Sequence, residues 1–299
     1  DNSKNDEFLC NNFINGLEDG EFKSFSSESH KLYSTESYSL GLRDGDFKYY
    51  DNETGELNTL KIYKDDNLTK IIRYYCNLCK KDSWLYSHKY NQKRSEELYI
   101  VDDNGDELQH GLQKEWYPNG KIKIEDNYLN DQLHGPSVYW NEEGRGYIKS
   151  MYINGTEEGI ATSFYDGSLR SIAFYENGVK NGIETEFYYN DFMLRQTSYK
   201  DGHRVKRITY NVEYDLGFEV ISDAQIFMEE NGKMMIFDDL PIYSIERFDD
   251  YQLNGLYEQF YDNGKLEYSV VFKDDVEIDK TRKCYDYSGK KVSCILYKY

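Results

Sequence analysis

The stretch Cys76-Asn77-Leu78-Cys79 is the one pair of thiols in this chain whose spacing suits a metal ion. A structural zinc ion needs four sulfur or nitrogen ligands, usually from two such pairs or from one pair and two histidines. The nearest further candidate is His88, and no second pair of cysteines lies close to it in the sequence. We therefore expect no metal site and no other cofactor.

Two further cysteines, Cys284 and Cys294, flank a turn at Ser288-Gly289 and should fall almost opposite each other on a hairpin. Neighbours of this kind can form a disulfide in an exported protein. The chain has five cysteines, however, an odd number at uneven spacing, which is unlike a dense disulfide framework. Free structural cysteines are the first interpretation, and a disulfide between Cys284 and Cys294 is the alternative.

The histidines and carboxylates do not form a catalytic constellation. His110 and His134 both stand directly before a glycine of an internal repeat, and a residue that recurs in each repeat has a structural role. The chain has 55 Asp and Glu residues, so pairs of acids are frequent in it, and a pair suited to glycoside chemistry does not indicate a catalytic site. The sequence also lacks a nucleophile elbow, a P-loop and a zinc-protease helix motif. We expect no enzymatic activity.

The repeat is marked by glycines that each precede an aromatic residue by five positions. The pairs are Gly20–Phe25, Gly45–Tyr50, Gly111–Trp116, Gly135–Trp140, Gly159–Phe164, Gly182–Phe187 and Gly255–Phe260. A second aromatic residue stands two positions before a pair of turn-forming residues, as in Tyr152-Ile153-Asn154-Gly155. Such self-similarity at a fixed period predicts a repeat architecture.

Each repeat predicts a β-hairpin. Its strands are rich in β-branched and aromatic residues, and Asn-Gly pairs supply the positive φ angles of tight turns, as at Asn119-Gly120 and Asn263-Gly264. No segment shows a sustained helical period with caps. The predicted fold is all-β, an elongated single antiparallel meander of stacked hairpins with about ten repeats of 23–25 residues.

We expect residues 1–299 to form a single rod of repeats. Its predicted parts are N-terminal repeats at 15–68, an atypical segment at 69–107, regular repeats at 108–205, degenerate repeats at 206–250 and C-terminal repeats at 251–299. The chain begins at Asp1 without an initiator methionine, so removal of a signal peptide and trimming both fit. The sequence leaves open whether the protein is cytoplasmic or exported.

The unit that begins at Gly111 reads Gly-x4-Trp-Tyr-x-Asn-Gly-Lys-x-Lys, and later units continue with Tyr-x-Asn-Gly and a return to His-Gly. This pattern resembles the MORN-repeat variant of many bacterial proteins. Some of these are YwqK-like antitoxins or immunity proteins paired with secreted or polymorphic toxins. The resemblance implies a MORN-like sheet and a protein-binding role, most concretely that of a bacterial antitoxin. The alternative is an exported or surface-exposed structural or adhesion protein.

The net charge of −19 favours a basic protein as partner, such as a cognate toxin. Nucleic acid and anionic lipid both demand a surplus of Lys and Arg, and no apolar run reaches the ~18 residues that insert into a membrane. The free chain is expected to be a monomer. Acidic doublets at loops, among them Glu142-Glu143 and Glu157-Glu158, are candidate contacts; the alternative is that they are solvated turn residues.

The aromatic residues give a second set of candidate contacts. Because neighbours along a strand point to opposite faces, the aromatics five after each glycine should line the packed face and the tyrosines that follow them the other face. These tyrosines are Tyr117, Tyr165, Tyr188 and Tyr261. Tyrosine is common at interface hot spots, so an exposed ladder of them suits partner binding. Shielding of the sheet's own second face is the alternative interpretation.

Overall fold

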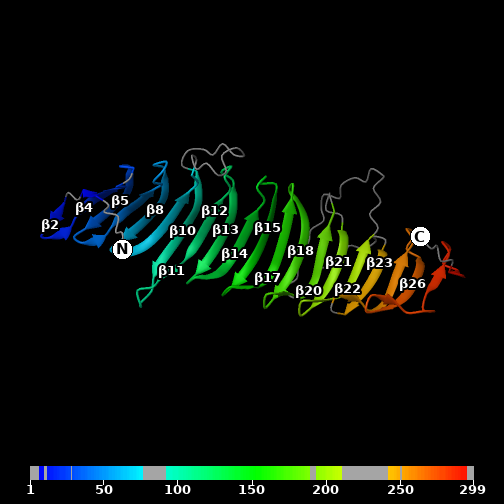
Figure 1. The fold of residues 1–299 in the computed structure, drawn as a ribbon. Helices are drawn as coiled ribbons and strands as arrows, with labels where there is room; N and C mark the ends of the chain where they lie inside the picture. The colour runs from blue at the N-terminus through cyan, green and yellow to red at the C-terminus, as the bar shows by residue number, and fades with distance from the viewer. Residues whose placement is uncertain are drawn as a thin grey trace. The chain divides into compact units, whose positions relative to one another are not determined.

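The computed structural model describes residues 7–9, 12–27, 29–76, 92–188, 193–210, 242–249 and 251–294. All regular elements among these residues are β-strands (Figure 1). Parts of two predicted segments, residues 77–91 and 211–241, lie outside the described residues, and so do Cys79 and His88.

The chain divides by its contacts into two units, Asp1–Tyr147 with Tyr152–Gly155 and Ile148–Met151 with Thr156–Tyr299. The strands of the first unit are β1 (Glu7–Leu9), β2 (Phe13–Ile14), β3 (Leu17–Glu18), β4 (Gly20–Phe25), β5 (Leu32–Ser39), β6 (Leu42–Arg43), β7 (Gly45–Tyr50), β8 (Leu57–Lys64), β9 (Asn67–Tyr74), β10 (Lys93–Val101), β11 (Glu107–Gln109), β12 (Gly111–Trp116), β13 (Ile122–Leu129) and β14 (Gln132–Trp140). Strand β15 (Gly146–Ile153) contributes residues to both units.

The strands of the second unit are β16 (Thr156–Glu157), β17 (Gly159–Tyr165), β18 (Ser168–Glu176), β19 (Val179–Lys180), β20 (Gly182–Phe187), β21 (Met193–Lys200), β22 (His203–Tyr210), β23 (Ile242–Asp249), β24 (Gln252–Leu253), β25 (Gly255–Phe260), β26 (Leu266–Lys273), β27 (Val276–Glu277), β28 (Lys283–Tyr285) and β29 (Lys291–Val292). In each unit, long strands pair antiparallel with their neighbours in the chain, as β12 does with β13 and β25 with β26. The prediction of an all-β meander of successive hairpins is confirmed.

Two kinds of turn alternate along the hairpins. The tight turns have two successive residues at positive φ, for example Asn154 at +50° and Gly155 at +79°. The second kind spans Tyr117 to Lys121, where the Gly120 N–H donates to the Tyr117 carbonyl at 2.9 Å and the Tyr117 N–H to the Lys121 carbonyl at 2.8 Å. Here only Gly120 has positive φ, so the expectation of a positive-φ pair at Asn119-Gly120 is wrong. The Asn119 side chain instead accepts the Lys121 N–H at 2.9 Å.

The buried cluster of the first unit consists of Phe47, Tyr63, Leu68 and Ile71. Phe47 stands two residues after Gly45, not five, so the expected place of the packed aromatics is only partly right. Among the aromatic residues that stand five positions after a glycine, Phe187 is buried, whereas Trp116 and Phe260 are half-buried. A register shift directly before the fifth residue, as between Glu115 and Trp116 and between Glu186 and Phe187, interrupts the alternation of faces, so spacing alone does not fix the burial of this residue.

Cys284 and Cys294 form a disulfide with their Cα atoms 5.3 Å apart. Strand pairing places Cys284 opposite Val292, which brings Cys294 within reach across the hairpin. The first interpretation, free structural cysteines, is therefore wrong for this pair, and the alternative holds. Cys76 is disulfide-bonded as well.

Replacing both Cys284 and Cys294 by serine is expected to loosen the terminal hairpin. The closed loop is short, with a sequence separation of 10, and a cross-link of this size stabilises by about 2–3 kcal/mol. Hydrogen exchange of the backbone amides of β28 and β29 measures the change. Unaltered protection of these amides in the double variant would show that strand pairing alone holds the hairpin.

Candidate binding site

The signature residues of the repeat connect each hairpin to the next one. In the first unit, the Tyr117 hydroxyl donates to the Trp140 carbonyl at 2.7 Å, and the Asn119 side chain donates to the Glu142 carbonyl at 3.0 Å. The ammonium group of Lys121 donates to the Glu143 carbonyl. Tyr, Asn and Lys of the signature thus satisfy backbone carbonyls of the following turn.

The second unit repeats this arrangement at its own signature. The hydroxyl of Tyr261 donates to the Tyr285 carbonyl at 2.9 Å, and Asn263 donates to the Tyr287 carbonyl at 2.9 Å. Lys265 donates to the Ser288 carbonyl at 3.0 Å. The sequence predicted Tyr117 and Tyr261 as partner contacts. Their hydroxyl groups instead donate hydrogen bonds to backbone carbonyls of the sheet.

The other candidates are also placed by the hairpins. Tyr165 is half-buried, with the Arg170 guanidinium 6.0 Å from its ring, and Tyr188 is half-buried at the end of a described segment. The Glu157 carbonyl accepts the Gly178 N–H at 3.0 Å, and the Glu158 carboxylate accepts the Asn177 N–H at 2.9 Å.

In the other candidate doublet, the Glu143 side chain is exposed and Glu142 is half-buried. The eight candidates lie on several hairpins of the two units.

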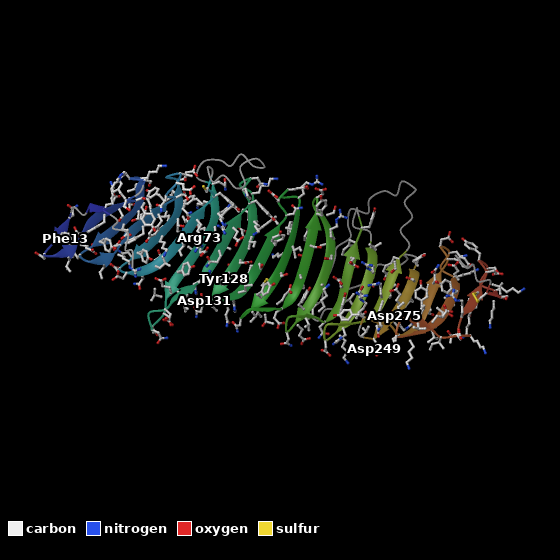
Figure 2. All side chains as sticks on the ribbon, in the orientation of Figure 1. Phe13, Arg73, Tyr128, Asp131, Asp249 and Asp275 are labelled. Atoms are coloured by element: carbon white, nitrogen blue, oxygen red, sulfur yellow. A yellow bond between two sulfur atoms is a disulfide. The ribbon has the colours of Figure 1, made fainter. Side chains whose placement is uncertain are left out.

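Acidic residues of the tight turns have a similar structural role. The carboxylates of Asp66, Asp131 and Asp275 accept backbone N–H groups of the preceding repeat, at 2.8, 2.6 and 2.7 Å. Figure 2 shows Asp131 and Asp275 at hairpin ends. The Arg43 N–H holds the pKa of the Asp66 carboxyl below its usual range.

The repeat histidines contact the side chains of the following tight turn. His110 Nδ1 lies 3.4 Å from the Asn130 side-chain oxygen, and His134 Nδ1 lies 3.2 Å from that of Asn154. The same contact thus recurs in both repeats, and we retain the prediction that these histidines have a structural role.

Removing the Tyr117 hydroxyl tests this connection between hairpins. The variant Tyr117→Phe leaves the Trp140 carbonyl without its donor, and we expect a loss of about 1 kcal/mol in unfolding free energy. Chemical denaturation of the full chain measures it. A variant as stable as the parent would contradict the structural role that we assign to the signature tyrosine.

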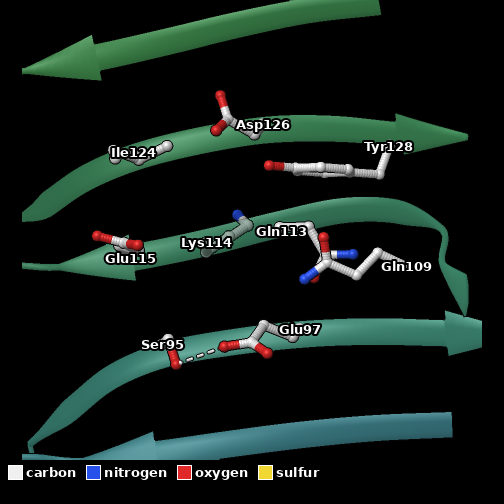
Figure 3. A pocket seen from close by; sticks show the side chains of 9 residues that line it. All are labelled: Ser95, Glu97, Gln109, Gln113, Lys114, Glu115, Ile124, Asp126 and Tyr128. Carbon is white, nitrogen blue, oxygen red and sulfur yellow. Dashed lines mark hydrogen bonds between the residues drawn. The ribbon is translucent and has the colours of Figure 1, made fainter. Parts of the chain in front are cut away.

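A hollow of about 100 Å³ lies on one face of β10, β12 and β13 (Figure 3). Its lining consists of Ser95, Glu97, Gln109, Gln113, Lys114, Glu115, Ile124, Asp126 and Tyr128. The strand register explains how the acids meet, because Gln113 is directly opposite Asp126 and Glu115 directly opposite Ser95. Residues directly opposite each other point to the same face of a sheet.

The hollow rests on side chains with fixed partners. Gln113 is 7% exposed. Its side-chain amide accepts the Leu98 N–H at 2.7 Å and donates to the Leu98 carbonyl at 2.9 Å. Glu97 pairs with Arg73 and accepts the Ser95 hydroxyl at 3.0 Å and the Tyr99 hydroxyl at 2.9 Å. These bonds leave the floor of the hollow little freedom to rearrange.

The wall of the hollow holds two more carboxylates. Glu115 forms an ion pair with Lys123 at 2.9 Å. The Oδ1 atom of Asp126 is buried and has no hydrogen-bond partner among the described residues. Burial raises the pKa of the Asp126 carboxyl; the Ser137 hydroxyl opposes this rise and the charge of Glu115 adds to it. The ammonium group of Lys114 is engaged with Glu125 at 2.7 Å.

Tyr128 lies across the hollow from the glutamines (Figure 3). Burial first, and then the charges of Asp126, Glu115 and Glu97, raise the pKa of its hydroxyl. The phenol therefore stays protonated at neutral pH and offers a neutral aromatic face beside three carboxylates. No group of three or more metal-ligating side chains occurs in the part of the chain that the structure describes.

Neutralising Asp126 should stabilise the fold. The pKa of its carboxyl is raised in the folded chain above the usual 3.8, so the folded state holds more protons between these two values and loses stability as pH rises through them. We expect Asp126→Asn to gain about 1 kcal/mol at pH near 7, because an unpaired buried acceptor is costly. Thermal unfolding at neutral pH and below pH 3.8 measures the gain, which should vanish at the acidic end.

Two segments of the chain, residues 109–130 and 253–274, match the family model of the MORN repeat variant. The chain thus carries MORN-type repeats. No curated protein matches the chain. No helix in the described ranges is long and apolar enough to cross a membrane.

The two matched MORN repeats share their signature but differ at the hollow. The positions of Glu115 and Asp126 in the first are those of Gln259 and Val270 in the second, counted from Gly111 and Gly255. Val270 is fully buried, and Tyr257 of the same face stacks on Tyr268 at 5.6 Å. The acids at Glu115 and Asp126 are therefore not part of the signature that the two matched repeats share. The signal that could have found it is this pair of acidic departures at diagonal positions of two paired strands.

Proposed function

We propose that this chain is a non-enzymatic repeat scaffold that binds a basic protein, and that the free chain is a monomer. The observation that carries the proposal is the hollow on β10, β12 and β13, where the three carboxylates of Glu97, Glu115 and Asp126 share one face. The signature residues around it are occupied in joining hairpins, which suits a rigid platform more than a catalytic centre.

The most specific form of this proposal is a bacterial antitoxin or immunity protein of the YwqK-like kind. Its mechanism would be coverage of the basic active-site region of a toxin, which excludes the toxin's substrate. The net charge of −19 supports fast, steered association with such a partner. The half-buried Tyr165 and the exposed Glu143 are proposed as further contacts.

A second candidate function is that of an exported or surface-exposed structural protein used in adhesion. The disulfide between Cys284 and Cys294 favours it, because such bonds persist in oxidising compartments. Mass spectrometry of the protein from its native cells distinguishes the two, since only the second requires the pair to be oxidised there.

The test of the first proposal is calorimetric titration of the full chain with the product of the neighbouring gene. We expect binding tighter than micromolar that weakens as the salt concentration rises. A partner that binds no tighter than micromolar, or whose affinity ignores salt, would overturn the proposal of an electrostatic scaffold.

A further inference from the structure

A ladder of aromatic rings in edge-to-face contact runs across the first hairpins of the first unit. Successive ring centroids lie 6.0, 5.1, 5.3 and 4.9 Å apart, and the rings belong, in order, to Phe13, Phe22, Tyr38, Phe47 and Tyr63. Phe47 has a ring on each side and is 3% exposed, whereas Phe13 is 58% exposed. Among the described residues, the aromatic ladder is therefore open at Phe13 (Figure 2).

The backbone of the first hairpin is open on the same side. In the described part of the chain, β2 pairs with β3 alone. The Asp19 N–H donates to the Asn12 carbonyl at 3.1 Å, so the polar backbone groups of Asn12 point into the hairpin. Because those of successive strand residues point to alternate sides, the N–H and C=O of Phe13 point to the outer edge of β2.

The first tight turn lacks a hydrogen bond that later tight turns make to the preceding repeat. The Gly41 N–H donates to the Glu18 carbonyl at 2.7 Å, and the Gly155 N–H to the Leu133 carbonyl at 2.8 Å. The same bond is made by the N–H groups of Asp66, Asp131, Gly178, Gly202 and Asp275. Gly16 has the same kind of conformation, with φ +80°, but its N–H has no acceptor among the described residues. A further strand beside β2 would supply this acceptor.

The chain's own junctions between hairpins show which side chain such a strand places over the open ring. Arg43 stands two positions before a leading glycine, and its guanidinium lies 4.2 Å from the ring centroid of Tyr63 in the next strand pair. Lys180 has the same position in its own repeat, and its ammonium lies 5.2 Å from the ring centroid of Tyr199. These tyrosines stand two positions before a tight turn, as Phe13 does. An added strand of this kind therefore brings a cation over the Phe13 ring.

The charges beside the aromatic ladder also favour a basic strand. Glu18 is directly opposite Phe13 and so points to the same face. Burial, followed by the charges of Glu36 and Glu18, raises the pKa of the Tyr38 hydroxyl, which places both carboxylates near the ladder. Neither of them forms an ion pair within the part of the chain that the structure describes. Lysine or arginine of a partner would complement them.

We propose that the outer edge of β2 receives an extended segment of the basic partner as an added strand, with a lysine or arginine of that segment over the Phe13 ring. This inference rests on the proposed function and adds to it the mode of recognition. An added strand also accounts for the exposure on both faces, since Phe13 lies on one face and Ile14, 46% exposed, on the other. A partner that lay flat on one face would cover only one of them.

The last strand of the second unit has features that discourage strand addition. Strand β29 carries Lys291, follows Lys290, and lies beside the disulfide between Cys284 and Cys294. Charged side chains, lysine above all, protect the edge of a sheet in this way. Residues 12–18 contain neither lysine nor proline. The first hairpin therefore lacks this protection, as a strand-accepting edge requires.

The experiment is an NMR titration of the deuterated, nitrogen-15-labelled full chain. The probe is the acetylated and amidated peptide Leu-Arg-Asn-Gly-Lys-Phe-Lys-Tyr-Tyr, which is the sequence of residues 42–50 with asparagine in place of Asp44 and lysine in place of Asp46. We expect the amide signals of Phe13 and Gly16 to shift saturably and hydrogen exchange at Gly16 to slow by about tenfold or more. The Gly41 amide already has its acceptor and should not change.

Three results would overturn the proposal. The first is a titration that leaves the Phe13 and Gly16 amides unshifted. The second is equal binding of a peptide that has glutamate in place of its arginine, because we expect that peptide to bind about tenfold more weakly. The third is a shift of the same two amides with rising concentration of the chain alone, which would make a second copy the occupant of this edge.

A pair of variants tests the contact with the open ring. Phe13→Ala should weaken binding of the peptide by about fivefold or more, because it removes the ring under the arginine. The matched control Tyr243→Ala removes a ring that is 43% exposed on β23 and should leave binding unchanged. Undiminished binding by Phe13→Ala would contradict the proposal.

The outcome is separable from that of the proposed function. If the peptide binds at β2 but no basic protein binds the chain, the strand-accepting edge stands and the protein-binding scaffold falls. If a basic protein binds equally well to the parent and to Phe13→Ala, the scaffold stands and the strand-accepting edge falls.

Discussion

Replacing Phe47 by alanine is expected to lower the unfolding free energy of its hairpins by about 4 kcal/mol. Phe47 is 3% exposed and belongs to the buried cluster of the first unit. Its ring lies edge-to-face with Tyr63, at 4.9 Å between centroids, and with Tyr38, at 5.3 Å. The substitution removes both ring contacts and leaves a cavity in a sheet that has little other apolar packing.

Hydrogen exchange of the amides of β7 and β8 measures this loss, because opening of these strands is then reported separately from the rest of the chain. The matched control is Phe13→Ala. Phe13 also makes an edge-to-face contact, with Phe22 at 6.0 Å, but it is 58% exposed. We expect less than about 1 kcal/mol there. Equal effects of the two variants would show that burial of Phe47 does not stabilise the first unit.

The second large effect is expected for Gly45→Ala, about 2–3 kcal/mol of unfolding free energy. Gly45 has φ +108°, outside the left-handed region that other residues tolerate. A Cβ at this position would also lie 3.2 Å from Cβ of Ser37 on the neighbouring strand. Strain in the backbone and the close approach therefore act together.

A glycine of the tight turns supplies the comparison. Gly155 has φ +79° with nothing within 4 Å of an added Cβ, and asparagine is the residue that best tolerates such angles. Gly155→Asn should cost well under about 1 kcal/mol by chemical denaturation. If Gly45→Ala lowered the unfolding free energy as little as Gly155→Asn, backbone conformation would not explain why glycine recurs at the leading position of the repeats.

The fold was predictable because a period of two dozen residues repeats both its turns and its strands. Asn154-Gly155 forms the expected tight turn. The second turn was not predictable in detail, because the same Asn-Gly pair at Asn119-Gly120 fits two turn types that differ only in which residues pair across the strands. The disulfide likewise follows from the register of β28 and β29, which places Cys284 opposite Val292.

The candidate site was less predictable, because it depends on which residues pair across the strands. Along the sequence, Gln113 and Glu115 look like ordinary polar positions of a strand, and Glu97 falls in an atypical segment. Only the pairing of β10, β12 and β13 brings Glu97, Glu115 and Asp126 onto one face. The spacing of the tyrosines predicted partner contacts instead. It does not reveal that a tyrosine hydroxyl bonds to the next hairpin, as that of Tyr117 does.

The most direct test of a binding face on β10, β12 and β13 is carboxyl labelling of the full chain, alone and in complex with its basic partner. Carbodiimide modification followed by mass spectrometry reports the reactivity of each carboxylate. We predict that Glu97, Glu115 and Asp126 lose reactivity in the complex, while the exposed Asp262 does not change. Hollow carboxylates that stay as reactive in the complex as in the free chain would contradict the account.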